Sequence, residues 1–223
     1  MSTYSMSSST ADNPMMQSVP NNNYDTNQCL YAASTLNAVT RSILSFYLNI
    51  DGPGGLPSNA IISSATLSLY ALGVLASRTI TAYRVLRTDW SSPQSTWNNY
   101  KTGYLWATAG AKNTTSDITT TDAATSASLS TVGWQSWDIT NQAKTAKAIG
   151  TIYVLIADDG SAVSGGQTYA AKEYTTDTSK QPHLTIEYTV PSIKTVNGLA
   201  KASVKTLRSG LLIASGKTWD GLV

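Results

Sequence analysis

Residues 60–72 read Ala-Ile-Ile-Ser-Ser-Ala-Thr-Leu-Ser-Leu-Tyr-Ala-Leu. From Ala65 onward every second residue is apolar, namely Ala65, Leu67, Leu69 and Ala71. Successive side chains of a β-strand point to opposite faces of the sheet. The alternation therefore predicts a half-buried strand with its apolar row directed at a core.

Further strand-like segments lie on both sides of this one. One helical turn is predicted, over residues 142–148, with Thr140 or Asn141 as its N-cap. Many short strands with little helix are typical of an all-β sandwich or barrel. The predicted strands cover residues 15–19, 39–50, 79–85, 134–140, 151–157, 168–174 and 182–190.

The chain divides into three parts in this interpretation. Residues 1–11 are a polar N-terminal arm, residues 12–190 are a β-sandwich, and residues 191–223 are a tail that begins at Pro191. Hydrophobic residues make up 41% of the chain, which is enough for one sizeable core.

The tail repeats one short pattern in three copies. They read IKTVNGLA from residue 193, VKTLRSGLL from residue 204 and GKTWDGLV from residue 216. Asn-Gly and Asp-Gly pairs favour tight β-hairpin turns, so we expect a small β-meander that needs another surface to pack on. The predicted assembly contacts are Lys194, Val196, Leu199, Lys205, Leu207, Leu211, Lys217, Trp219 and Leu222.

The composition excludes several classes of function. Charged residues are 13% of the chain, the net charge is +2, and no basic stripe suggests a nucleic-acid groove. No apolar run is long enough to span a membrane. The N-terminal residues lack the features of a secretory signal, so we expect synthesis in a host cytoplasm without a signal peptide. The single cysteine, Cys29, cannot form an intrachain disulfide.

The sequence predicts no enzyme and no cofactor. The one histidine, His183, has no nucleophile motif or second metal ligand to work with. The acidic candidates for glycoside hydrolysis are better explained as loop or strand residues; they are Asp158, Asp159, Glu173 and Glu187. A structural Ca²⁺ held by Asp51, Asp158 and Asp159 is a weaker alternative to ordinary turn residues, and no metal site is assigned.

A long connection over residues 88–116 concentrates aromatic side chains. Trp97, Tyr100, Tyr104 and Trp106 fall within it. Exposed aromatic rings can stack on the C–H faces of sugar rings, whereas buried ones fill a core or a subunit contact. Both interpretations stay open, and the glycan platform is the less favoured of the two.

Eight short segments match a known family in their order and spacing: residues 20–30, 41–46, 61–69, 85–90, 95–97, 133–140, 172–173 and 182–188. Through them, residues 12–189 resemble the DNRLRE-type domain, a jelly-roll β-sandwich related to carbohydrate-binding modules. The resemblance implies a jelly-roll fold and a binding role.

The tail resembles C-terminal repeats of virion proteins of tailed bacteriophages. This resemblance implies a non-enzymatic structural protein of the virion, such as a capsid decoration, head fibre or tail component. Its expected partners are capsid or tail proteins and further copies of the same chain in a homo-oligomer. The alternative is a carbohydrate-binding module that holds a glycan on the aromatic loop.

Overall fold

The computed structural model describes residues 1–35, 38–76, 78–126, 129–158, 160, 164–191, 195–196, 199–200, 204–208 and 211–214. The chain forms two compact units, Met1–Thr189 and Val190–Val223.

The first unit is almost entirely β, which confirms the predicted all-β class. One α-helix, α1 (Thr140–Ala146), and two short 3₁₀ turns, Ser92–Gln94 and Thr178–Lys180, interrupt the strands. The strands are β1 (Ser2–Met6), β2 (Ala11–Met16), β3 (Cys29–Thr35), β4 (Ala38–Tyr47), β5 (Ile61–Leu75), β6 (Ile80–Val85), β7 (Asn99–Lys101), β8 (Tyr104–Leu105), β9 (Ile118–Ser126), β10 (Gly133–Asp138), β11 (Thr151–Asp158), β12 (Gly165–Ala170) and β13 (His183–Thr189).

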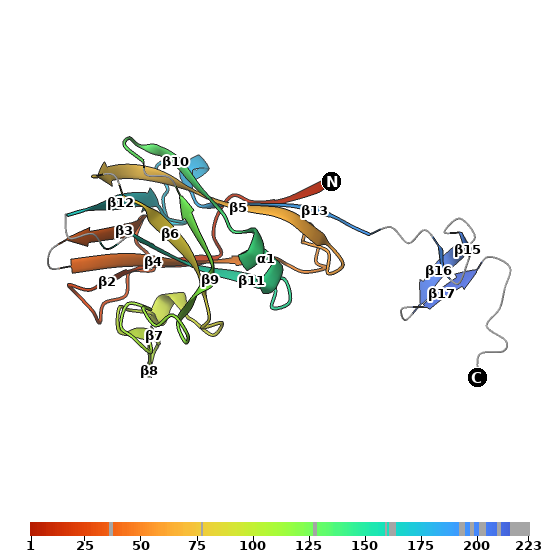
Figure 1. The fold of residues 1–223 in the computed structure, drawn as a ribbon, viewed down its shortest axis with the longest axis horizontal. Helices are drawn as coiled ribbons and strands as arrows, with labels where there is room; N and C mark the ends of the chain where they lie inside the picture. Colours follow the sequence, from red (N-terminus) through yellow and green to blue (C-terminus); the bar gives the residue numbers. More distant parts are fainter. Residues whose placement is uncertain are drawn as a thin grey trace. The chain divides into compact units, whose positions relative to one another are not determined.

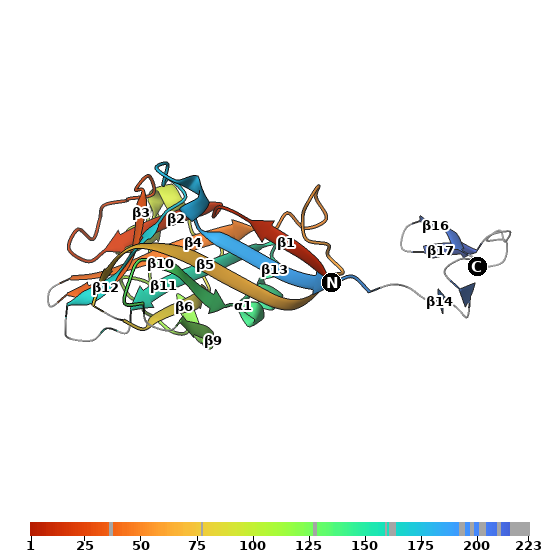
Figure 2. The same cartoon turned by 90° about the horizontal axis from the view of Figure 1, so that it is seen from above.

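The main sheet is antiparallel and curls into two layers. Its strands follow the order β1-β13-β5-β12-β3-β4-β11-β6-β9, with β10 beside β5 and β2 beside β4. Strands β13, β5 and β10 belong to one layer, and β4, β11 and β6 belong to the other (Figures 1 and 2). Strands β12 and β3 connect the layers, and the result is a jelly-roll-type sandwich.

The central core lies between the two layers. On β5 the predicted apolar row, Ala65, Leu67, Leu69 and Ala71, is at most 1% exposed, so the predicted alternation is confirmed. The opposite layer contributes residues such as Phe46 to the same core. Burial of these apolar side chains is the main stabilising term of the sandwich.

The β4–β11 layer has a second core on its outer face. Ile43 on β4 and Leu155 on β11 point away from the central core and pack under the connection between β6 and β9. Strand β4 is therefore buried on both faces, and its residues 42–46 are all buried. This second core contains most of the aromatic residues of the long loop.

The N-terminal residues are part of the sandwich. We expected residues 1–11 as an arm and a strand at 15–19, but Ser2–Met6 pairs with Leu184–Tyr188 of β13, and β2 begins at Ala11. Pro14 lies within β2, which a strand at an edge tolerates because one row of its N–H groups needs no partner. These segments are polar, so the sequence does not mark them as strands. They form strands because β13 and β4 offer edges to pair with.

Two other elements differ from the sequence prediction because of tertiary contacts. The helix begins at Thr140 instead of Gln142, and Ile139 occupies the N-cap without a side-chain bond. The Thr140 hydroxyl instead accepts a hydrogen bond from the N–H of Ala65 on β5. Strand β9, which is rich in Thr and Ala, was not predicted; it forms because β6 offers a partner edge.

The second unit contains two short hairpins among its described residues. Strand β14 (Thr195–Val196) pairs with β15 (Leu199–Ala200), and β16 (Val204–Arg208) pairs with β17 (Leu211–Ala214). These pairings flank the Asn-Gly and Ser-Gly dipeptides of the first two repeats. Each hairpin is a separate two-stranded sheet, whereas a continuous meander was expected. The Asp-Gly dipeptide of the third repeat lies outside the described residues.

The carboxyl group of Asp12 is buried in this fold. Its Oδ2 accepts hydrogen bonds from Ser9 Oγ at 2.7 Å and from the N–H of Lys172 at 2.9 Å, while Oδ1 has no partner among the described residues. Burial raises the pKa of Asp12 to about 7, against the opposing effect of these bonds. Neighbouring Glu173 raises this pKa further and the Lys172 charge lowers it.

We expect Asp12 to make stability depend on pH. An unfolded aspartate titrates near pH ~4, so the folded chain holds an extra proton between about pH 4 and about pH 7. The free energy of unfolding should therefore fall as pH rises through this window. Asp12→Asn should flatten the dependence in urea unfolding measured across the window, whereas the exposed control Asp89→Asn should not. An unchanged slope in Asp12→Asn would contradict this assignment.

Candidate functional site

The aromatic loop proposed as a glycan platform is mostly buried. Trp97, Tyr100 and Trp106 are 4%, 7% and 4% exposed and belong to the second core. Of the four proposed residues only Tyr104, at 54%, is open to solvent. A platform needs an accessible ring face, so the four residues cannot stack on a sugar together.

The loop is a packed element held by its own polar contacts. The indole N–H of Trp106 donates to the carbonyl of Thr96 at 3.0 Å. Buried Asp117 accepts from the N–H groups of Ala107, Thr108 and Asn113 at 2.9, 3.0 and 3.3 Å. The long connection is therefore structural, and its aromatic residues cover the outer face of β4 and β11.

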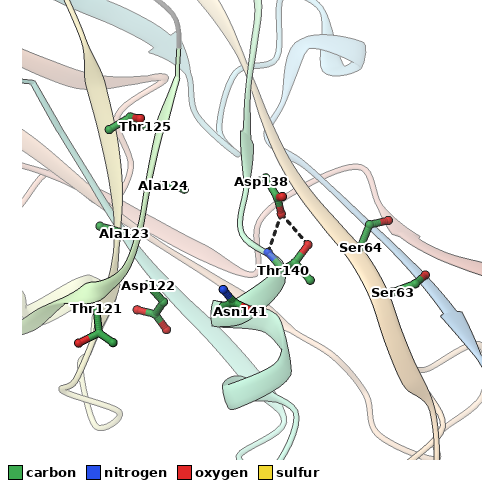
Figure 3. Close-up of a pocket in the computed structure, with 10 residues that line it drawn as sticks. All are labelled: Ser63, Ser64, Thr121, Asp122, Ala123, Ala124, Thr125, Asp138, Thr140 and Asn141. Carbon is green, nitrogen blue, oxygen red and sulfur yellow. Dashed lines mark hydrogen bonds between the residues drawn. The ribbon is translucent and has the colours of Figure 1, made fainter.

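A polar groove opens where the two layers of the sandwich meet beside α1. Strand β9 pairs with β6 and β10 pairs with β5, but β9 and β10 do not pair with each other along their described residues. A groove of about 480 Å³ lies between β9 on one side and β5, the end of β10 and the start of α1 on the other. Its lining, drawn in Figure 3, is Ser63, Ser64, Thr121, Asp122, Ala123, Ala124, Thr125, Asp138, Thr140 and Asn141.

Two side chains, those of Arg84 and Gln142, hold the β9 wall of the groove in place. Arg84 Nε donates to Asp122 Oδ2 at 2.6 Å. Gln142 Nε2 donates to the carbonyls of Ala82 and Asp122 at 2.9 and 3.0 Å. The guanidinium of Arg84 balances the carboxylate charge of Asp122, so this wall is polar and close to neutral.

The opposite wall is organised by Asp138 at the end of β10. Its Oδ1 accepts from the N–H and the hydroxyl of Thr140 at 3.0 and 2.5 Å (Figure 3). These hydrogen bonds hold the pKa of Asp138 below its usual range, so the carboxylate stays ionised at neutral pH. The Asn141 amide beside it is exposed and makes no side-chain hydrogen bond within the described part of the chain.

The groove presents hydroxyl, amide and carboxylate groups and backbone of an unpaired strand edge. Such groups donate and accept hydrogen bonds in the way that sugar hydroxyls require. Its volume lies within the ~300–1,000 Å³ range of small-molecule sites. Its described lining contains no Lys or Arg. The geometry therefore suits a neutral polyhydroxylated ligand better than an anion.

A second surface lies on the exposed face of β10 and was missed by the sequence interpretation. Trp134 is 42% exposed, whereas Trp137 is 1% exposed. The strand alternation contains the signal: residues 134 and 137 are an odd number apart and must face opposite ways. Trp134 lies against Tyr70 and His183, the only histidine of the chain.

The acidic residues weighed for calcium or catalysis lie apart in the structure. Asp158 is buried, accepts from Ser34 Oγ at 2.5 Å and faces Arg78 Nε at 4.0 Å, so it is not the loop residue that was expected. Asp51 accepts from the N–H of Ser58. Among the residues that the structure describes, no group of three or more His, Cys, Asp or Glu could hold a metal.

Other acidic candidates have local partners. Glu173 forms an ion pair with Lys172, and the carbonyl of Glu187 accepts from Ser63 Oγ at 2.9 Å. Asp159 lies outside the described residues. None of the candidates that the structure describes lines the groove beside α1.

The predicted assembly contacts fall in the second unit. Val196, Leu199, Lys205, Leu207 and Leu211 lie on its short strands. Lys194, Lys217, Trp219 and Leu222 lie outside the described residues. The docking role of this unit stays a prediction.

The sandwich and its polar groove define a β-sandwich module of the ligand-binding kind. A sequence model of carbohydrate-binding module family 96 matches residues 3–188. The match covers almost the whole first unit, and the chain therefore belongs to this family. No curated protein matches the chain. In the described part of the molecule, no helix is long and apolar enough to cross a bilayer.

Proposed function

We propose that this protein binds carbohydrate through its sandwich unit and performs no chemistry on it. The observation that carries the proposal is the match to carbohydrate-binding module family 96, which spans residues 3–188 and stops at the end of the sandwich. The groove beside α1 is the binding site that fits this role.

The groove chemistry supports a neutral glycan. Ser64, Thr125 and Asn141 offer hydroxyl and amide groups, and Asp138 offers an ionised acceptor. Uronic-acid residues would bring like charge next to Asp138 without a cation in the described lining to compensate. Walls held by internal hydrogen bonds need little reorganisation on binding, which favours affinity.

The test is binding of the full chain to neutral and acidic polysaccharides in affinity electrophoresis, followed by calorimetry on the best ligand. Asn141→Ala should weaken binding about fivefold, because one or two hydrogen bonds of ~0.5–1.5 kcal/mol each are lost. Asn59→Ala is the matched control, since Asn59 is also exposed but does not line the groove.

Three results would contradict the proposal in different ways. Absence of binding to every polysaccharide would rule out carbohydrate binding as the function. Equal affinity of Asn141→Ala and the native chain would show that the ligand binds outside the groove. Release of reducing ends from a bound polysaccharide would identify an enzyme instead of a binding module.

Assembly into a phage virion stays a separate prediction. It rests on the repeats of the second unit, which the family match does not cover. The short hairpins there agree with the repeat pattern, but they identify no partner. A homo-oligomeric state and a location in the virion likewise stay predictions. Carbohydrate binding is thus the better supported function.

A further inference from the structure

Three rings form a compact aromatic surface on the exposed face of the sheet. Trp134 on β10 lies directly opposite Tyr70 on β5, and their ring centroids are 5.4 Å apart in an edge-to-face arrangement. The His183 ring on β13 stacks on the indole with centroids 4.7 Å apart and planes at 23°. These residues come from three neighbouring strands, so the backbone fixes their relative positions.

Charged side chains also hold the Tyr70 ring of the cluster in place. Lys180 Nζ lies 4.8 Å from the centroid of the Tyr70 ring, and Asp177 forms an ion pair with Lys180 at 3.3 Å. Burial lowers the pKa of His183, so the imidazole is neutral at physiological pH and stacks as an uncharged ring. Trp134 is nevertheless 42% exposed. The open surface of the indole is available for stacking. Because the ring is already held in place, it loses little conformational entropy when a ligand binds.

A row of polar pairs connects this cluster with the groove. Strands β10 and β5 place Trp134 opposite Tyr70, Ser136 opposite Ser68, and Asp138 opposite Thr66. The hydroxyls of Ser136 and Ser68 lie 2.8 Å apart. Asp138 lines the groove.

The length of this row sets the size of ligand that it suits. The four steps along the strand from Trp134 to Asp138 extend about 13 Å at ~3.3 Å per step. This distance exceeds one pyranose ring. A linear chain of sugars could therefore lie along β10 with one end in the groove and the other against the indole.

We propose that Trp134, supported by Tyr70 and His183, is a sugar-stacking platform that extends the groove into a binding surface for a linear neutral oligosaccharide. The inference rests on the proposed carbohydrate binding. The indole covers the apolar C–H face of one sugar ring and excludes water from it. Between the platform and the groove, the serine hydroxyls donate hydrogen bonds to the sugars and accept hydrogen bonds from them, whereas the Asp138 carboxylate only accepts.

The experiment is a titration of the full chain with an oligosaccharide ladder prepared from the best neutral polysaccharide. In the native chain affinity should rise with length until the ligand spans both ends of the surface. Trp134→Ala should weaken the longest oligosaccharide about tenfold, since aromatic stacking contributes on that scale. The same variant should bind the shortest ligand unchanged, because that ligand occupies the groove alone.

Two controls separate this result from a general loss of structure. Tyr104→Ala removes an exposed aromatic ring that lies outside the proposed binding surface and should not alter any affinity. Trp134→Phe keeps a stacking ring, so it should retain most of the affinity while losing the ligand-induced change in tryptophan fluorescence. Thermal unfolding of each variant should stay close to that of the native chain, because neither Trp134 nor Tyr104 belongs to the buried cores.

The outcomes distinguish the two proposals. If the native chain binds no glycan, the proposed function fails and the platform fails with it. If it binds glycan but Trp134→Ala binds every length like the native chain, the groove stands and the platform is wrong. A length-dependent loss confined to Trp134→Ala supports the platform.

Discussion

Replacing Trp97 with alanine is expected to lower the free energy of unfolding of the sandwich by ~3–5 kcal/mol, as for other buried aromatic residues. The indole is 4% exposed within the second core. One side of it meets the backbone at Gly110, where an added Cβ would lie 2.6 Å from the ring. Lys112 Nζ lies 5.1 Å from the ring centroid. The truncated side chain would leave a cavity that the surrounding loop cannot fill without moving.

Tyr104→Ala is the matched control for this prediction. Tyr104 belongs to the same loop but is 54% exposed, so its removal should change stability by less than ~0.5 kcal/mol. Urea unfolding followed by circular dichroism measures both effects. Equal small changes in the two variants would refute the burial of Trp97. A normal stability of Trp97→Ala with a selective loss of glycan binding would restore the loop as the binding platform.

Replacing Asp117 with alanine is the second change expected to have a large effect. Its carboxylate is fully buried and accepts three backbone hydrogen bonds from the aromatic loop, and Arg87 Nε lies 3.5 Å from Oδ1. Alanine would leave three backbone donors unsatisfied, each at a cost of ~1–3 kcal/mol. We expect a loss of about 3 kcal/mol or more in the free energy of unfolding.

A surface aspartate gives the comparison for Asp117. Asp89 is 54% exposed and pairs with Lys101 in the same part of the chain. Asp89→Ala should cost no more than ~1 kcal/mol, because exposed ion pairs contribute little. Asp117→Asn keeps one acceptor oxygen but directs an amide N–H₂ at donors, so it should also be destabilising. Similar stability of Asp117→Ala and Asp89→Ala in urea unfolding would show that Asp117 does not organise the loop.

Some features of the candidate site follow from the local sequence pattern, and others follow only from the tertiary arrangement. The alternation of β10 places Trp134 and Trp137 on opposite faces, but it does not say which face is covered. Only the position of the second layer makes Trp137 the core residue and leaves Trp134 open. The groove has no sequence signal of its own, because its walls come from segments far apart in the chain: β9 on one side, and β5, the end of β10 and the start of α1 on the other.

The sequence by itself determined the class of the fold. Alternation in residues 60–72 identified a half-buried strand, and the spacing of short segments identified an all-β sandwich, because strand periodicity is a property of the local chain. The tertiary structure alone decided which aromatic rings are exposed and where the groove opens. It also decided that Ser2–Met6 and Ile118–Ser126 are strands, because a polar segment becomes a strand only when the edge of another strand supplies its hydrogen bonds. These properties depend on contacts between residues far apart in the chain, which no local pattern encodes.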